Sequence, residues 1–157
     1  MKKIVTPVLV LFGCIAIACN NADKKHDGHT MNEPKTLADS LMKDIDDSHM
    51  VGMSKIGKLH NTRKEVQRVI DSISKLSTKS QQSTTLYLDQ LNTVIKDLDY
   101  ADFAMDKWMT EFEMDSAANN MEQRIKYLAD EKLKVSKVKE AMLSSMQKAD
   151  SLLKAKL

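Results

Sequence analysis

Apolar residues recur in alternating steps of four and three along most of this chain, and this spacing constrains the fold more than any other feature. It places one apolar stripe along a helix, and such a stripe must pack against another helix. The first stripe follows a capping box, in which Thr36 caps the helix and Asp39 reaches back to it. Its members are Ala38, Met42, Ile45, His49, Gly52, Ile56, Leu59, Arg63, Val66, Ile70 and Ile73.

Two further stripes follow the polar break at residues 77–84. The second is wide, because a parallel row repeats at seven-residue intervals beside it, so we expect it to contact two neighbouring helices. The third is less regular between Leu128 and Val135, where we expect a local change in winding or register. The second stripe comprises Leu88, Leu91, Ile95, Leu98, Asp102, Met105, Met109 and Phe112, with Tyr87, Val94, Ala101 and Trp108 beside it, and the third comprises Met121, Ile125, Leu128, Val135, Val138, Met142, Ala149 and Leu152.

The three stripes predict an all-α fold. The whole chain has only four glycines and two prolines, and both prolines precede residue 35, so little interrupts the helices. We expect an up-down-up three-helix antiparallel bundle over residues 36–157, with long helices at about 36–77, 84–114 and 120–156. One long rod or a parallel coiled coil is the alternative, but the polar breaks near residues 77–84 and 113–120 argue against it.

The start of the chain has the order of an export signal: two lysines, an apolar run, then small residues. The apolar run is about 15 residues long, whereas a membrane-spanning helix needs roughly 20. The ending "AIAC" resembles the lipobox of bacterial lipoproteins. That resemblance implies a signal peptide at residues 1–18 and a diacylglycerol on Cys19. Cys14 is the alternative acceptor, and a plain secretory signal also stays open.

Removal of this signal would change both the cysteine count and the charge. Cys14 would leave and Cys19 would become a thioether, so no thiol would remain for a disulfide, a nucleophile or a metal. Without Lys2 and Lys3, basic and acidic residues are equal in number. A near-neutral chain lacks the basic surplus that nucleic acids require, so we expect no nucleic-acid partner and membrane attachment through acyl chains alone.

Residues 19–35 carry almost nothing apolar, so we interpret them as the lipidated cysteine followed by a flexible tether. Its "HDGHTM" holds His26, His29 and Met31, which can bind a transition metal weakly. Ordering the segment would cost entropy that two or three ligands barely offset.

A second candidate metal site follows from helix register. If the chain reverses direction near residue 80, the helical turn "HMVGM" of the first helix lies opposite the helical turn "MDKWM" of the second, because both helices advance equally per residue. Thioethers, an imidazole and an indole face are groups that suit Cu(I). Methionine also fills irregular cores, and a lone histidine often makes only a hydrogen bond. The residues of this candidate site are His49, Met50, Met53, Met105, Trp108 and Met109.

The same register predicts polar contacts between the first two helices. Arg63 falls near Asp97 and Asp99 and more than one turn from Asp102, so we expect a pair with one of the first two. His60 falls level with Tyr100, and we expect a hydrogen bond between them.

Three segments behind the lipobox, "DSHMVGMSKIGKL", "ADFAMDKWMTEF" and "YLADEKLKVSKVKEAMLSSMQKADSLL", resemble a family of small bacterial lipoproteins labelled "viral A-type inclusion protein". The resemblance covers about residues 45–153, and its most particular element is the run from Met105 through Trp108 and Met109 to Phe112. It implies a helical lipoprotein and transfers no catalytic or binding residue.

The sequence favours a non-catalytic role. It holds no GxSxG, HExxH or phosphate-binding glycine loop. We therefore expect a structural or interaction lipoprotein of the bacterial envelope, anchored in the outer membrane and facing the periplasm, with a protein partner that the sequence does not identify. A copper-binding envelope lipoprotein is the alternative, followed by a hydrolase whose site the sequence does not reveal.

Overall fold

The computed structural model describes residues 35–155, and all of the regular secondary structure in this part is helical, with no strand. This confirms the all-α prediction. None of its helices is long and apolar enough to cross a membrane. The expected signal peptide, Cys14, Cys19, His26, His29 and Met31 lie outside the described residues. The helices are α1 (Leu37–Met53), α2 (Ile56–Ser74), α3 (Thr78–Ser83), α4 (Thr85–Glu111) and α5 (Met121–Lys154).

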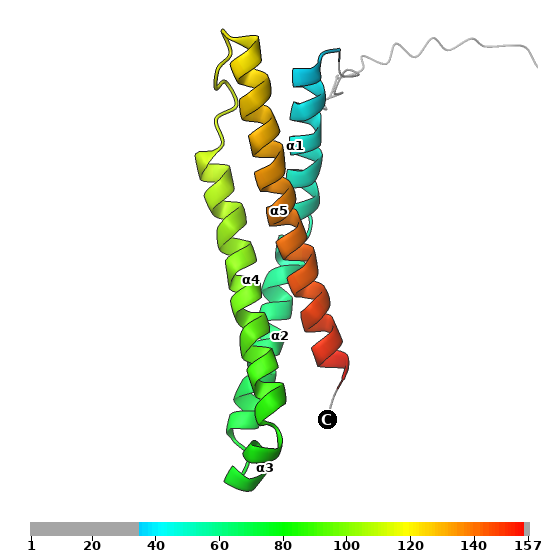
Figure 1. Ribbon diagram of the computed structural model, residues 1–157. Coiled ribbons are helices and arrows are strands. Elements are labelled where there is room, and N and C mark those ends of the chain that lie inside the picture. The colour runs from blue at the N-terminus through cyan, green and yellow to red at the C-terminus, as the bar shows by residue number, and fades with distance from the viewer. Residues whose placement is uncertain (1–34, 156–157) are drawn as a thin grey trace, which may run out of the picture. The chain divides into compact units, whose positions relative to one another are not determined.

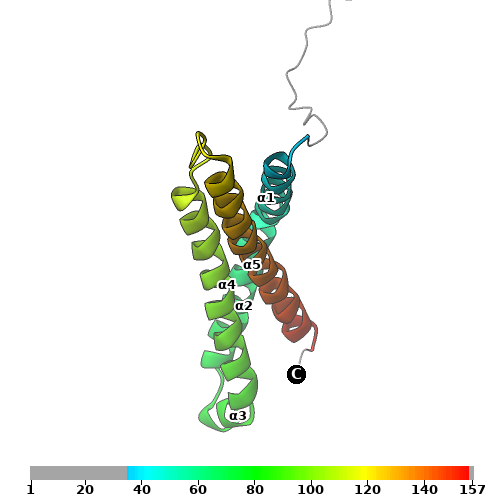
Figure 2. The same ribbon diagram turned by 45° about the horizontal axis from the view of Figure 1, so that its top comes forward.

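The long helices pack side by side (Figure 1). α1 and α2 follow one another in one direction, α4 returns, and α5 runs back beside them. α5 lies between α1 and α4, as a view turned by 45° also shows (Figure 2). α1 packs mainly on α5, whereas α2 packs on both α4 and α5. α1 therefore makes few contacts with α4, whereas α2 packs directly against it.

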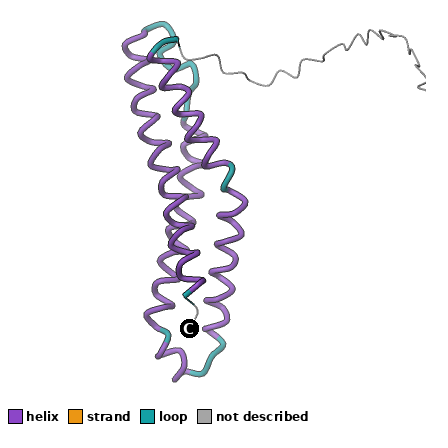
Figure 3. The backbone as a smooth tube through the Cα atoms, turned by 90° about the vertical axis from the view of Figure 1, so that its right-hand side faces the viewer, coloured by secondary structure: helices purple, strands orange, loops and turns teal. Residues whose placement is uncertain are grey.

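The single helix expected at residues 36–77 is broken at Ser54 and Lys55, and the break is visible as a short loop in Figure 3. The local sequence explains it, because Gly52 and Gly57 flank the break and glycine is a poor helix former. The Ser54 hydroxyl donates to the Val51 carbonyl at 2.7 Å, and Lys55 N–H donates to the Gly52 carbonyl at 2.9 Å, three residues back. These bonds replace the regular helical pattern and bend the chain.

The first stripe is only partly the core. The stripe consists of two rows, each with a seven-residue repeat. One row is buried on both sides of the break and comprises Ala38, Ile45, Gly52, Leu59, Val66 and Ile73. The other row, which includes Met42, His49 and Arg63, is half-buried. Leu41, Ser48 and Thr62 are buried in its place.

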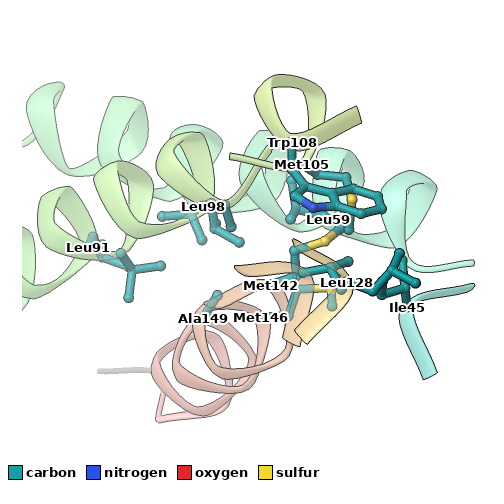
Figure 4. Close-up of a cluster of buried hydrophobic side chains, with 14 of the residues drawn as sticks. Ile45, Leu59, Leu91, Leu98, Met105, Trp108, Leu128, Met142, Met146 and Ala149 are labelled. Carbon is teal, nitrogen blue, oxygen red and sulfur yellow. The ribbon is translucent and has the colours of Figure 1, made fainter. Parts of the chain in front are cut away.

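The other two stripes meet this row in the centre of the bundle (Figure 4). The expected contact of the second stripe with two neighbours is confirmed, since α4 packs on both α2 and α5. Two seven-residue rows of the stripe supply its buried members, Leu91, Leu98 and Met105 in one and Val94, Ala101 and Trp108 in the other. In the third stripe, the expected change of winding is wrong, because α5 is an unbroken α-helix from Met121 to Lys154. The gap between Leu128 and Val135 is instead filled by Glu131, which is only 4% exposed.

Candidate functional site

The register argument correctly places His49 beside the C-terminal part of α4. His49 Nε2 lies 3.3 Å from the Sδ atom of Met109. The imidazole ring also lies 5.5 Å from the indole ring of Trp108, centroid to centroid, at a tilt of 44°. Three of the six residues of the predicted metal site therefore meet, two from α4 and one from α1.

The other three predicted residues are arranged differently. Met50 and Met53 are 58% and 38% exposed and do not line the pocket beside His49. Met105 is fully buried, and its thioether packs over Gly52 together with that of Met142. Met105 therefore belongs to the core, and Met50 and Met53 take no part in the pocket where His49 meets Met109.

Two residues that the sequence analysis did not select complete the surroundings of His49. A pocket of about 360 Å³ between α1 and the end of α4 is lined by His49 and by three methionines, Met42, Met109 and Met114. Met42 precedes His49 by one seven-residue step, so the first stripe carried a signal for it. Met114 follows the end of α4, where no periodic pattern applies.

A buried hydrogen bond fixes the indole that borders this pocket. Trp108 Nε1 donates to Glu131 Oε2 at 2.9 Å, and Lys134 Nζ donates to the other oxygen of that carboxylate at 2.7 Å. The hydrogen bond to Glu131 raises the pKa of Lys134. The indole also stacks on Phe112 at 5.0 Å, and Phe112 stacks on Tyr127 at 6.2 Å. The indole is thus held at its N–H edge by Glu131 and on one face by Phe112.

The contacts between α2 and α4 test the two polar predictions. Arg63 makes a two-pronged hydrogen bond with the Asp99 carboxylate, which confirms one of the two expected pairs. This bond raises the pKa of the Arg63 guanidinium. The expected bond from His60 to Tyr100 is wrong, since His60 Nε2 lies 3.0 Å from both oxygens of Asp102. The actual partner lies two residues further along α4, on the side that faces α2.

Between residues 35 and 155, no group of three or more His, Cys, Asp or Glu side chains comes together in a way that could hold a metal ion. Methionine is not among these four residue types, so the thioethers beside His49 are a separate kind of donor group. The tether candidates His26, His29 and Met31 are not placed by the structure.

A second surface lies on the face of the bundle formed by α4 and α5 alone. Two pockets, of about 670 and 400 Å³, are lined only by residues of these two helices. The rim of the smaller one carries Tyr100 and Phe103, each 63% exposed. Large aromatic side chains in such exposed positions mark a surface that can bind an apolar partner.

In comparisons with known proteins, no family model, no curated protein and no solved structure matched this chain.

Proposed function

We propose that this chain is a lipid-anchored, non-catalytic interaction module of the bacterial envelope. In this proposal the signal at residues 1–18 is removed, Cys19 carries the lipid, and the tether holds an up-down-up three-helix bundle near the outer membrane on its periplasmic side. The order of basic, apolar and small residues before Cys19 supports the anchor.

The observation that carries the interaction role is the open groove between α4 and α5. Tyr100 and Phe103 expose most of their ring surface at its rim, where exposure to water is unfavourable. Aromatic side chains also contribute strongly to binding at protein interfaces. A groove between two helices is suited to an amphipathic helix, which lays its apolar face into it.

The charges around the groove indicate the kind of partner. Lys107, Lys134 and Lys137 line the pocket beside Phe103, whereas Glu111 is its only acidic lining residue. Two of these lysines are paired within their own helices, Lys107 with Glu111 and Lys134 with Glu131, whereas Lys137 makes no salt bridge with the described residues. We therefore expect a helical segment of another envelope protein that places an acidic residue opposite Lys137, beside its apolar face.

Site-specific crosslinking in native envelopes tests this proposal. A photoreactive amino acid at Phe103 of the full chain should capture one protein repeatedly, with or without a metal chelator. The same probe at Lys64, an exposed α2 residue outside both pockets, is the matched control. Capture should fall when Tyr100 is replaced by alanine. An identical pattern from Lys64, or no reproducible product from Phe103, would contradict the interaction role.

The anchor is tested separately by mass spectrometry of the natural protein. The expected amino terminus is an acylated Cys19. An unmodified terminus, or one at another residue, would remove the anchor from the proposal and leave the groove to be judged on the crosslinking alone.

A further inference from the structure

We infer that the pocket between α1 and the end of α4 is a binding site for a soft monovalent metal ion, Cu(I) or Ag(I). The ligands are His49 Nε2 and Met109 Sδ, with Met42 and Met114 as the other thioethers of the same pocket. This inference does not depend on the α4–α5 groove, which shares α4 and Trp108 with this pocket but is lined by neither His49 nor the three methionines.

The first argument is the number of thioethers gathered around one imidazole. A single contact between His49 and Met109 forms readily as a weak hydrogen bond, in which a ring N–H donates to sulfur. That bond needs one methionine, but three of them line this pocket. Thioether and imidazole ligands together select Cu(I) over ions that prefer oxygen, such as Mg²⁺ and Ca²⁺.

The second argument is the distance between the two principal ligand atoms. A tetrahedral ion with bonds of about 2.0 Å to nitrogen and about 2.3 Å to sulfur holds these atoms about 3.5 Å apart. The observed separation of His49 Nε2 and Met109 Sδ is 3.3 Å. A shift of a few tenths of an ångström in a half-exposed methionine would therefore admit the ion.

The third argument is the position of Trp108. Its ring centroid lies 5.5 Å from that of His49 and both side chains line the pocket, so an ion on the indole side of the imidazole would lie close to the indole face. A cation within about 6 Å of a tryptophan ring is attracted to it. The hydrogen bond to Glu131 and the stacking on Phe112 hold this face in place before any ion binds.

Access and charge also suit an ion from the periplasmic solution. Met109 and Met114 are 37% and 62% exposed, so the sulfur side of the pocket opens to solvent. Asp46 lines the pocket as well, and its carboxylate would favour a positive charge there.

Titration of the full chain with Ag(I), and with Cu(I) under anaerobic conditions, tests the inference. Trp108 is the only tryptophan of the protein, so the emission comes from one side chain that borders this pocket, and the ligand variants separate a signal at this pocket from one at the α4–α5 pocket that Trp108 also lines. We expect a saturable change in emission at one equivalent of ion. Competition with a chromogenic Cu(I) chelator gives the dissociation constant independently of fluorescence.

Variants assign the ligands. Met109→Leu and His49→Gln should each weaken binding by at least about tenfold, since even outer residues of metal sites cost 10- to 100-fold when replaced. Met42→Leu and Met114→Leu should each weaken it by a smaller factor. The double variant Met50→Leu with Met53→Leu changes two methionines of α1 outside the pocket and should bind as the unmodified chain does. Circular dichroism melts establish that each variant is folded.

The outcomes are decisive in both directions. Wild-type affinity in Met109→Leu and His49→Gln would overturn the site, as would the absence of a saturable response at one equivalent. Binding that survives both changes but disappears when His26 and His29 are replaced would place the ion on the tether and also overturn it. Failure here would leave the crosslinking test of the groove unaffected.

Discussion

Gly52 and Gly57 flank the same helix break, and alanine at the two positions should have different effects on stability. A Cβ atom at Gly52 would lie 2.3 Å from the Met105 methyl carbon and 3.3 Å from Met142 Sδ. A Cβ atom at Gly57 would meet nothing within 4 Å. The pair therefore separates the helix propensity of alanine from the cost of overpacking at one level of the bundle.

The magnitudes follow from these distances. Alanine in a helix is favoured over glycine by about 0.5–1 kcal/mol, so Gly57→Ala should raise the free energy of unfolding by about that amount. Gly52→Ala gains the same propensity but must displace the methyl end of Met105, which is flexible but fully buried, so the cost lies near the lower end of the about 1–3 kcal/mol that overpacking takes. We expect Gly52→Ala to be the less stable of the two by about 1 kcal/mol.

Urea unfolding followed by circular dichroism measures this difference, with an unchanged m-value as the check on compactness. A Met105→Ala background is the control, because it removes the atom that the new methyl group would strike. In that background most of the penalty of Gly52→Ala should disappear, since only the 3.3 Å contact with Met142 Sδ remains, and a double-mutant cycle would detect the change. Equal stabilisation by Gly52→Ala and Gly57→Ala in the wild-type background would refute the close approach of α1 to Met105.

Three further predictions concern single contacts. Trp108→Phe removes the indole donor from the buried Glu131 carboxylate and should lower the free energy of unfolding by about 1–3 kcal/mol, measured by circular dichroism. Glu131→Gln keeps an acceptor oxygen for the indole and should cost less. Thr36→Ala removes the cap of α1 and should cost about 1 kcal/mol at neutral pH. Because hydrogen bonding from Thr36 lowers the pKa of Asp39 below its ordinary 3.8, the contribution of the capping box is complete above that pH, and the difference between Thr36→Ala and wild type should shrink as the pH falls below it. Ala117 has a φ of 54°, so Ala117→Gly should raise the thermal midpoint, and an unchanged or lower midpoint would argue against that conformation.

The seven-residue row from Ala38 to Ile73 could be predicted because it depends only on local periodicity. Each of its members is buried, even across the break. The companion row that contains His49 and Arg63 could not be placed so well. Since α1 and α2 pack on different sets of neighbours, the buried stripe broadens toward Leu41, Ser48 and Thr62, and that shift depends on tertiary contacts.

The misassigned positions involve polar side chains whose partners lie far away in the sequence. A glutamate in an amphipathic helix normally faces solvent, so the gap in the α5 stripe suggested a change in winding. Glu131 is nevertheless a core residue, because the Trp108 indole N–H, 23 residues earlier, satisfies its carboxylate. The partner of His60 was wrong for a related reason, since a carboxylate two residues from the predicted level forms a better contact than the phenol of Tyr100.

The break between α1 and α2 explains why the metal-site candidates meet at His49 and nowhere else along the first stripe. The Ser54 and Lys55 backbones stay in right-handed helical conformations, so the chain bends there without losing the seven-residue register from Gly52 to Leu59. On the N-terminal side of the bend, α1 packs on α5 and separates from α4. The space that opens between α1 and α4 is the pocket that His49 and the three methionines line. On the C-terminal side of the bend, α2 stays against α4, and its polar residues pair directly with aspartates. The first stripe thus makes direct polar contacts with α4 where the helices are close and borders a sulfur-lined pocket where they diverge.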